Sequence, residues 1–345
     1  MEASRQALRG IYAPPRAKKP WRLDELLAPT RLRYFSYGRA ALSRALGLCG
    51  AKQGDLILLP GLICREVLPA LEPFGAWPLY YAVDESLNPA ADTSRLPPAR
   101  AVVAVNYFGF PQDLSYWRAY CARTGAALIE DNAHGLFSLG PDGSWLGTRA
   151  DFGIFSLRKT MALPDGAALA MPESGRFPLP AQETFVRRAH PRQLAKRLLS
   201  LTVPVLGTGV VRGLHRLWRG HGNAGDAAST YPVHPAALDP RPGRELAQPL
   251  VLADPEAEIA RRRALYSLAD GLVRPAGGVP IFPRLPDGVC PYGFPYYADE
   301  VTAPEIETAL DQEGLESFPW PDLPDAAANQ TPPHYRRIRC VRFLW

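Results

Sequence analysis

The stretch AVVAVNYFGF at residues 101–110 begins with five consecutive apolar residues and turns polar at Asn106. A continuous apolar run of this length is typical of a parallel strand buried on both faces. Working outward from it, apolar runs predict further strands at 56–59, 77–83, 126–129, 151–157 and 167–171. Amphipathic segments between or beside these runs predict helices at 38–48, 66–71 and 113–123. This alternation predicts an α/β domain with a mostly parallel sheet flanked by helices.

The length and composition describe an ordinary globular chain with room for two domains. It has 345 residues, of which 47% are hydrophobic and 21% charged, and its net charge is +5. Its 37 prolines are about twice the usual share. We expect an N-terminal extension over 1–30, a large domain over 31–245 and a smaller C-terminal α+β domain over 246–345.

The cysteines and the N-terminus indicate which classes of protein are not expected. The five cysteines are scattered without a Cys-x-x-Cys pair, so neither a zinc site nor a disulfide framework is predicted. The N-terminus is polar and basic, without an apolar signal core. No apolar run approaches the roughly 20 residues that span a bilayer. We therefore expect a reduced, cytoplasmic protein.

The segment 176–220 is strongly basic and carries nine Arg and Lys residues against Glu183 alone. It contains an apolar stretch, 198–211, that Pro204 interrupts. One interpretation is a helical excursion that packs on the domain or on a partner subunit. The alternative is peripheral contact with an anionic membrane through residues 187–219. Nucleic-acid binding is not predicted, because the basic residues lack interleaved aromatic side chains and a known motif.

Polar residues follow the apolar runs where ligands bind in such sheets, beyond the carboxyl ends of the strands. Asp131 follows one run, with His134 three residues later, and Ser156 and Lys159 follow the next. Pyridoxal phosphate (PLP) requires a lysine for covalent attachment, a carboxylate for its ring nitrogen and a phosphate cradle. Each of these residues alone is more often structural, but their joint order favours a PLP site.

A phosphate cradle is available at residues 38–40, where Gly38-Arg39-Ala40 opens a predicted helix. The free N–H groups of a helix N-terminus bind phosphate, and Arg39 adds positive charge.

Several of these stretches together resemble the DegT/StrS-type PLP-dependent aminotransferases. The stretches are FSYGRAAL (35–42), GDLILLPGLIC (54–64), VNYFGFPQDL (105–114), LIEDNAHG (128–135), DFGIFSLRKT (151–160), PDGAAL (164–169), PYGFPYY (291–297) and EGLESFPWPDLP (313–324). The resemblance implies the PLP-dependent transferase fold of type I and a homodimer with its site at the subunit interface. It also implies amino transfer from an amino acid to a keto sugar. In this family the donor is usually glutamate, and the sugar is typically linked to a nucleotide.

The resemblance assigns a role to each matching residue. Lys159 is the Schiff-base lysine and proton carrier, and Asp131 pairs with the ring nitrogen. His134 stands near the phenolic oxygen, and Ser156 contacts the phosphate. Cys64 lies near the cofactor ring, in a segment where relatives often supply a stacking aromatic residue.

The sequence also departs from the family pattern. Arg39 replaces the usual hydroxyl residue of the phosphate helix. The step from Ser156 to Lys159 is three residues where five are usual, whereas the step from Lys159 to Gly166 fits the family. A residue of the second subunit often contacts the phosphate in such enzymes, and Asn223 or Arg241 is a candidate.

Two other functions remain open at this point. Dehydratases and eliminating enzymes use the same cofactor, although the family's dehydratases replace the lysine with histidine. A non-catalytic member with a regulatory or scaffold role is the other possibility, and it follows from the altered phosphate helix.

Overall fold

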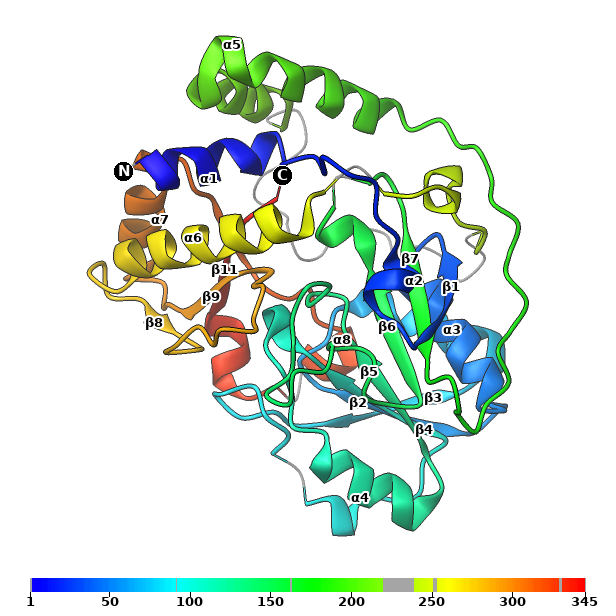
Figure 1. Cartoon of the computed structure of the whole chain (residues 1–345). Coiled ribbons are helices and arrows are strands. Elements are labelled where there is room, and N and C mark those ends of the chain that lie inside the picture. Colours follow the sequence, from blue (N-terminus) through cyan, green and yellow to red (C-terminus); the bar gives the residue numbers. More distant parts are fainter. Residues whose placement is uncertain are drawn as a thin grey trace.

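The computed structural model describes residues 2–90, 92–161, 163–219, 239–250, 253–328 and 331–344. Within these ranges the chain forms a seven-stranded sheet and a four-stranded sheet (Figure 1). The domain boundaries at residues 30 and 245 stay a prediction.

The large sheet has the strand order β1-β7-β6-β5-β4-β2-β3. Strands β2 to β6 run parallel to one another, and β7 pairs antiparallel with both β6 and β1. The strands are β1 (Arg31–Phe35), β2 (Leu56–Pro60), β3 (Trp77–Tyr81), β4 (Ala101–Val105), β5 (Ala127–Asp131), β6 (Phe152–Ser156) and β7 (Ala167–Met171). The predicted α/β class with a mostly parallel sheet is therefore confirmed.

Two helices flank this sheet and bury apolar side chains against it. Helix α3 (Gly38–Leu48) packs against β1, β6 and β7, and α4 (Ser115–Thr124) packs against β4 and β5. Trp117 of α4 is fully buried, with its ring 4.5 Å from that of Tyr81. The helix predicted over 66–71 is instead a 3₁₀ helix, Arg65–Ala70, with Pro69 inside it. Proline lacks the N–H that an α-helix needs at such a position.

The C-terminal part carries the four-stranded antiparallel sheet, in the order β10-β11-β9-β8. Its strands are β8 (Val279–Pro280), β9 (Gly293–Tyr297), β10 (Ser317–Pro319) and β11 (Ile338–Arg342). The accompanying helices are α6 (Pro255–Val273), α7 (Ala303–Gln312) and the short α8 (Asp325–Ala328). This mixture matches the α+β unit that the sequence predicts.

The first residues of the chain belong to the packed body. Helix α1 (Glu2–Tyr12) contacts α6 and α5, and it buries Ala7, Ile11 and Tyr12 in the main core (Figure 1). The short helix α2 (Leu23–Leu26) buries Leu23 in a second apolar cluster.

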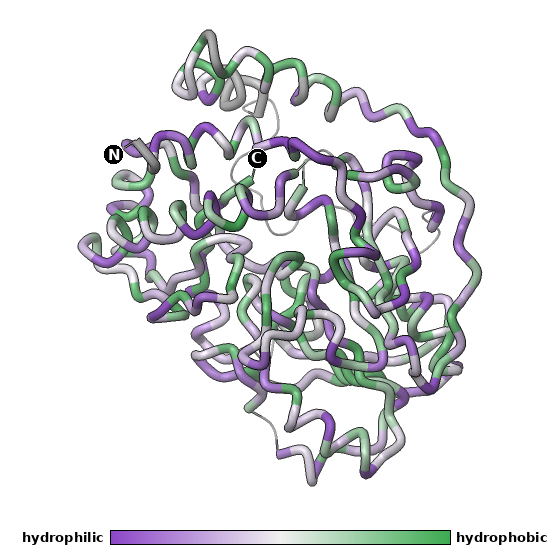
Figure 2. The backbone as a smooth tube through the Cα atoms, viewed as in Figure 1, coloured by the Kyte–Doolittle hydropathy of each residue, from purple (hydrophilic) through white to green (hydrophobic). Residues whose placement is uncertain are grey.

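The basic segment contributes the long helix α5 (Pro191–Arg219), along which hydrophobic residues recur in Figure 2. Its helical geometry breaks at Gly207, where φ is 75°. Val203 and Val211 are buried.

Part of this segment faces outward. Leu194, Leu198 and Leu201, spaced as one helix face, are 58–65% exposed. Basic side chains of the segment bind carboxylates, Arg176 at Asp151, Arg188 at Asp165 and Arg212 at Asp311. Within the described residues no helix has the length and apolarity needed to cross a bilayer. Peripheral membrane contact through 187–219 stays a prediction.

Candidate active site

The predicted functional residues meet at one edge of the large sheet. Asp131 is the last residue of β5 and Ser156 the last of β6, and these strands are parallel neighbours. The carboxyl end of β1 lies at the same edge, because Phe35 and Ser156 both pair with Ala167. Helix α3 begins just after β1 and brings its N-terminus to this edge.

A pocket of about 340 Å³ opens at this edge. The C-terminal sheet and its loops form its opposite wall, through Tyr292 and residues 318–322. Of the predicted site residues, those that line it are Gly38, Arg39, Cys64, Asp131, His134, Ser156 and Lys159.

Ala40 is the predicted site residue that the structure places differently. It is not among the residues that line the pocket, and its N–H donates to the carbonyl of Tyr37 at 3.0 Å. The N–H groups of Gly38 and Arg39 are then the candidates for binding an anionic group at this helix end.

A single 3₁₀ turn, Leu157–Lys159, accounts for the short step from Ser156 to Lys159. The Leu157 N–H donates to the carbonyl of Gly166 at 3.0 Å, which ties the turn to the start of β7. Gly166 has a φ of 134°, a conformation that side-chain-bearing residues rarely adopt. The compact turn brings Lys159 into the pocket although two residues are missing relative to the usual spacing.

The side chain of Lys159 is partly buried and lies near few charges. Burial lowers its pKa, while Cys64 and Asp131 act in the opposite direction. Among the described residues no ion pair joins Lys159 to a carboxylate. Its nearest polar contact is His134, with 3.1 Å between Nζ and Nε2.

Asp131 presents a carboxylate to the pocket without a cationic partner at ion-pair distance in the described chain. Its Oδ1 accepts the N–H of Ala133 at 2.9 Å. Burial raises the pKa of Asp131, and the charge of Lys159 lowers it. A carboxylate held in this way is suited to a cationic N–H group of a ligand.

His134 is only 6% exposed and packs against two aromatic rings. The Tyr292 ring stacks on it at 4.3 Å between centroids, and the Phe108 ring at 5.8 Å. Burial holds the pKa of His134 well below its ordinary value, and the positive charge of Arg262 acts in the same direction. The imidazole is therefore neutral at physiological pH.

Positive charge collects at the N-terminus of α3. Arg39 binds Glu66, with 2.7 Å between Nη1 and Oε2, and its guanidinium lies 4.7 Å from the centre of the Tyr37 ring. The guanidinium of Arg158 lies 5.5 Å from the same ring. The Nε of Arg39 is buried without a hydrogen-bond partner among the described residues. This end of the pocket suits an anionic group.

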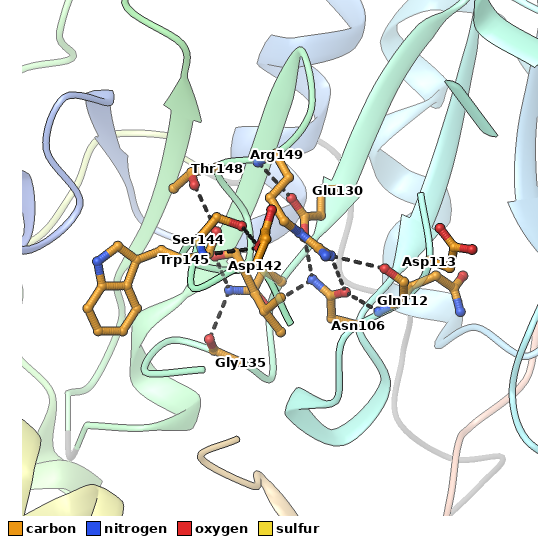
Figure 3. A network of polar contacts seen from close by, with 12 residues as sticks. Asn106, Gln112, Asp113, Glu130, Gly135, Asp142, Ser144, Trp145, Thr148 and Arg149 are labelled. Carbon is orange, nitrogen blue, oxygen red and sulfur yellow. Dashed lines mark hydrogen bonds and ion pairs between the residues drawn. The ribbon is translucent and has the colours of Figure 1, made fainter. Parts of the chain in front are cut away.

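A polar network joins Asn106, Glu130 and Arg149 at the ends of β4 and β5 (Figure 3). Glu130, fully buried next to Asp131, binds Arg149 at 2.6 Å. Asn106 donates to Glu130 at 2.8 Å and accepts the N–H of Gln112 at 3.0 Å. The network ties the ends of β4 and β5 together at the edge where the site lies.

Several site residues have no clear signal in the sequence. Tyr292, Trp320 and Phe108 surround His134, and Trp320 lies 4.6 Å from Phe108 between ring centres. Tyr292 belongs to the PYGFPYY stretch, but nothing in that stretch indicates which ring faces residue 134. Arg241 is paired with Asp239, and Asn223 lies outside the described residues.

Comparison with known proteins finds a family model that matches the part of the chain carrying these residues. The model of the DegT/DnrJ/EryC1/StrS aminotransferase family matches residues 34–174, which include Asp131, His134, Ser156 and Lys159. Over this stretch, which is less than half of the chain, the sequence is similar to the DegT/DnrJ/EryC1/StrS aminotransferases.

Two relatives show how much of the chain this similarity covers. L-glutamine:2-deoxy-scyllo-inosose aminotransferase of Streptoalloteichus tenebrarius is 34% identical over 135 residues, covering 37% of this chain and 31% of that protein. The chain thus matches about a third of the length of that relative. The dTDP-4-dehydro-2,3,6-trideoxy-D-glucose 4-aminotransferase of Saccharopolyspora spinosa is 27% identical over 310 residues, covering 86% of this chain and 73% of that protein.

Solved structures extend the likeness over the whole fold. A DegT DnrJ EryC1 StrS aminotransferase from Brucella abortus superimposes with a TM-score of 0.57 at 18% identity, covering 93% of this chain and 82% of that one. 3-Amino-5-hydroxybenzoic acid synthase gives a TM-score of 0.58 at 18% identity, covering 99% and 91%. The predicted type I fold of PLP-dependent transferases is confirmed.

Proposed function

We propose that this chain is a PLP-dependent aminotransferase that moves an amino group from an amino acid to the keto group of a sugar or cyclitol. The observation that carries the proposal is the convergence of Lys159, Asp131 and His134 in one pocket. A lysine amine, a carboxylate free of a protein cation and a neutral imidazole form the donor set that this cofactor requires.

The chemistry of the described residues supports this cofactor. In the proposal Lys159 would attach it covalently, and Asp131 would balance the positive charge of the ring nitrogen. The N–H groups of Gly38 and Arg39, with the buried hydroxyl of Ser156, suit the phosphate. The unpartnered Nε of Arg39 supports an anionic occupant at that end.

The chain's own residues then divide the work of the reaction. When bound, the cofactor supplies an electron sink for the substrate carbon. With the cofactor bound, the amine of Lys159 would carry the proton during amino transfer, and its lowered pKa suits this task. Asp131 would hold the positive charge of the ring nitrogen. Val103 and Ile154 line the pocket as apolar walls that exclude water.

The names of the relatives support a keto sugar or cyclitol as acceptor. The printed activities of the two relatives above concern an inosose and a dTDP-linked sugar. We therefore propose an acceptor of this class, nucleotide-linked or free, and glutamate or glutamine as the donor. A cytoplasmic homodimer stays a prediction.

The alternative reactions have less support from the site. The pocket retains a lysine where the family's dehydratases carry histidine, which favours amino transfer over dehydration. A scaffold role without catalysis gives no reason for a buried lysine amine beside a carboxylate that lacks a counter-ion. The membrane prediction for α5 is compatible with either function.

The test is a single-turnover assay with the purified chain. Protein loaded with PLP is treated with labelled glutamate or glutamine, freed of donor, and then given candidate keto sugars and inososes. We expect a visible absorbance band that the donor removes and an acceptor restores, with the label in the amino sugar. Lys159→Ala should show neither change. Loss of the label as ammonia or a dehydrated product would contradict amino transfer.

A further inference from the structure

We propose that the backbone N–H of Phe108 fixes His134 in the tautomer that carries its proton on Nε2, and that His134 thereby holds Lys159 as a neutral amine. Phe108 is then a positioning residue that acts through the imidazole. The inference rests on the proposed function only in taking Lys159 as the attachment residue.

The first step concerns the nitrogen of His134 that faces the protein backbone. The Phe108 nitrogen lies 3.3 Å from Nδ1 with hydrogen-bond geometry. A backbone N–H only donates, so Nδ1 must present its lone pair. In a neutral imidazole the proton then resides on Nε2.

The second step concerns the conformation that aims this N–H. Phe108 has φ 55° and ψ 16°, in the left-handed region that bulky residues rarely adopt. Neighbouring contacts hold it there. The Tyr292 N–H donates to the Phe108 carbonyl at 2.8 Å, and the Gly109 N–H donates to the carbonyl of Asn106 at 3.2 Å. Strained backbone of this kind persists where the surroundings fix it, and it is concentrated at functional sites.

The third step concerns the orientation of the ring. The His134 ring stacks on that of Tyr292 at an interplanar angle of 11° and on that of Phe108 at 27°. Turning the imidazole over would bring a carbon atom toward the Phe108 N–H and leave that buried donor unsatisfied. The two stacking rings and the backbone donor therefore select one orientation, with Nε2 toward the pocket.

The fourth step follows from the 3.1 Å contact between His134 Nε2 and Lys159 Nζ. An ammonium group has three donors and no acceptor. It would therefore face the Nε2–H of His134 with another donor, and no hydrogen bond could form. A neutral amine has a lone pair that accepts this hydrogen bond. The Nε2–H of His134 thus finds a hydrogen-bond acceptor only when Lys159 is uncharged.

The other groups around Lys159 have opposing effects on the pKa of its amine. Asp131 and Cys64 favour the charged form, whereas burial and the charge of Arg158 favour the neutral form. The Tyr292 ring centre is 5.9 Å from Nζ, and the Lys159 carbonyl accepts from Arg262 at 3.3 Å. His134 is the group in direct contact with the amine and decides between the two forms.

The consequence concerns attachment of an aldehyde. A neutral amine adds its lone pair to the carbonyl carbon, and the carbonyl oxygen finally leaves as water, whereas an ammonium must first lose a proton. Lys159 is therefore ready for attachment before any cofactor enters.

The first measurement is made on cofactor-free protein labelled with ¹⁵N at histidine. We expect the His134 signals of a neutral ring with bare Nδ1 and protonated Nε2 at neutral pH, assigned by loss in His134→Gln. Phe108→Gly retains the N–H and should retain the tautomer. A proton on Nδ1, or an imidazolium ring, would overturn the proposal, and so would loss of the tautomer in Phe108→Gly.

The second measurement follows acylation of lysines by peptide mass spectrometry as a function of pH. Lys159 should react at lower pH than the exposed Lys52 of the same molecule. His134→Gln preserves both the acceptor for Phe108 and a donor for Lys159, so the profile should stay. His134→Leu removes the donor and should shift the Lys159 profile upward by roughly one pH unit. A Lys159 profile that coincides with that of Lys52, or that is the same in all three proteins, contradicts the proposal.

Both measurements use protein without cofactor, so their outcome is independent of the proposed function. If the tautomer is found but PLP is never taken up, the proposed function fails and the inference about Lys159 stands.

Discussion

Arg262 of helix α6 donates from Nη2 to the main-chain carbonyl of Lys159 at 3.3 Å. Its other terminal nitrogen reaches the carbonyls of Pro291 and Tyr292 at 3.1 Å. One side chain, 1% exposed, thus links the turn that carries the lysine to the loop that carries the ring stacked on His134. Helix α6, from the C-terminal part of the chain, thereby helps to shape the pocket.

Replacement of Arg262 by methionine should weaken both the fold and the site. Glu258 is fully buried and binds Arg262 at 2.6 Å, so the change leaves a buried carboxylate with Arg261 as its remaining partner. We expect the free energy of unfolding to fall by about 3–5 kcal/mol. Denaturant unfolding measures this, with Arg274→Met on the surface of the same region as control. An equal, small effect of the two changes would contradict the linking role.

Asp131→Asn should change cofactor affinity and protein stability in opposite directions. The variant loses the charge that balances the ring nitrogen, so PLP binding should weaken by roughly 1.5–3 kcal/mol, about ten- to a hundredfold. Titration calorimetry measures this loss. Undiminished affinity in the variant would remove Asp131 from its assigned role.

The same variant tests the pH dependence of stability in the cofactor-free protein. Burial raises the folded-state pKa of Asp131 above the ordinary value of 3.8. Its contribution to stability is therefore fully present below that ordinary value and is lost as pH rises through the folded-state pKa. Near neutral pH, Asp131→Asn without cofactor should be as stable as the natural chain or more stable. Thermal unfolding across pH checks this, and a variant that is less stable at neutral pH contradicts it.

Removal of the Tyr292 ring should loosen His134. Stacked aromatic pairs contribute about 0.5–1.5 kcal/mol beyond burial, so Tyr292→Leu should weaken PLP binding up to about tenfold. Tyr292→Phe keeps the ring and is the matched control, with affinity expected to remain unchanged. Equal losses in the two variants would assign the effect to the hydroxyl and not to stacking.

Gly109 lies where the loops of the site pass closest to each other. Its φ is 89°, and an added Cβ would lie 2.7 Å from the Cys290 carbonyl oxygen and 3.1 Å from that of His134. Gly125 has a similar φ of 77° but open space around it. Gly125→Ala should cost about 1–2 kcal/mol from backbone strain alone. Gly109→Ala should cost roughly 3 kcal/mol or more, because the added Cβ also meets the two carbonyl oxygens. Thermal unfolding measures both costs. Equal costs for the two variants would show that the loops are not tightly packed at Gly109.

The sequence predicts the sheet edge better than the opposite wall of the pocket. Asp131 and Lys159 could be found because each follows an apolar strand, and parallel strands bring their carboxyl ends together. The tight turn that compensates for the short step from Ser156 to Lys159 depends on the hydrogen bond from Leu157 to Gly166, which spacing alone does not reveal. Ala40 is a residue that the sequence predicts at the phosphate site. In the structure the first turn of α3 already uses its N–H in a hydrogen bond within the helix.

The missed residues come from contacts between distant segments. Tyr292 and Arg262 reach the site from the C-terminal part, more than a hundred residues along the chain from Lys159. No local pattern encodes such a meeting. The left-handed conformation of Phe108 has only the following glycine as a signal, and glycine marks many turns.

The most direct test of the account is the identity of the lysine that binds the cofactor. The chain is loaded with PLP, reduced with borohydride and digested, and its peptides are analysed by mass spectrometry. The account predicts the reduced cofactor on Lys159 alone among the lysines, and its loss in Lys159→Ala. Cofactor attached to a different lysine, or no attachment at all, would contradict the central claim.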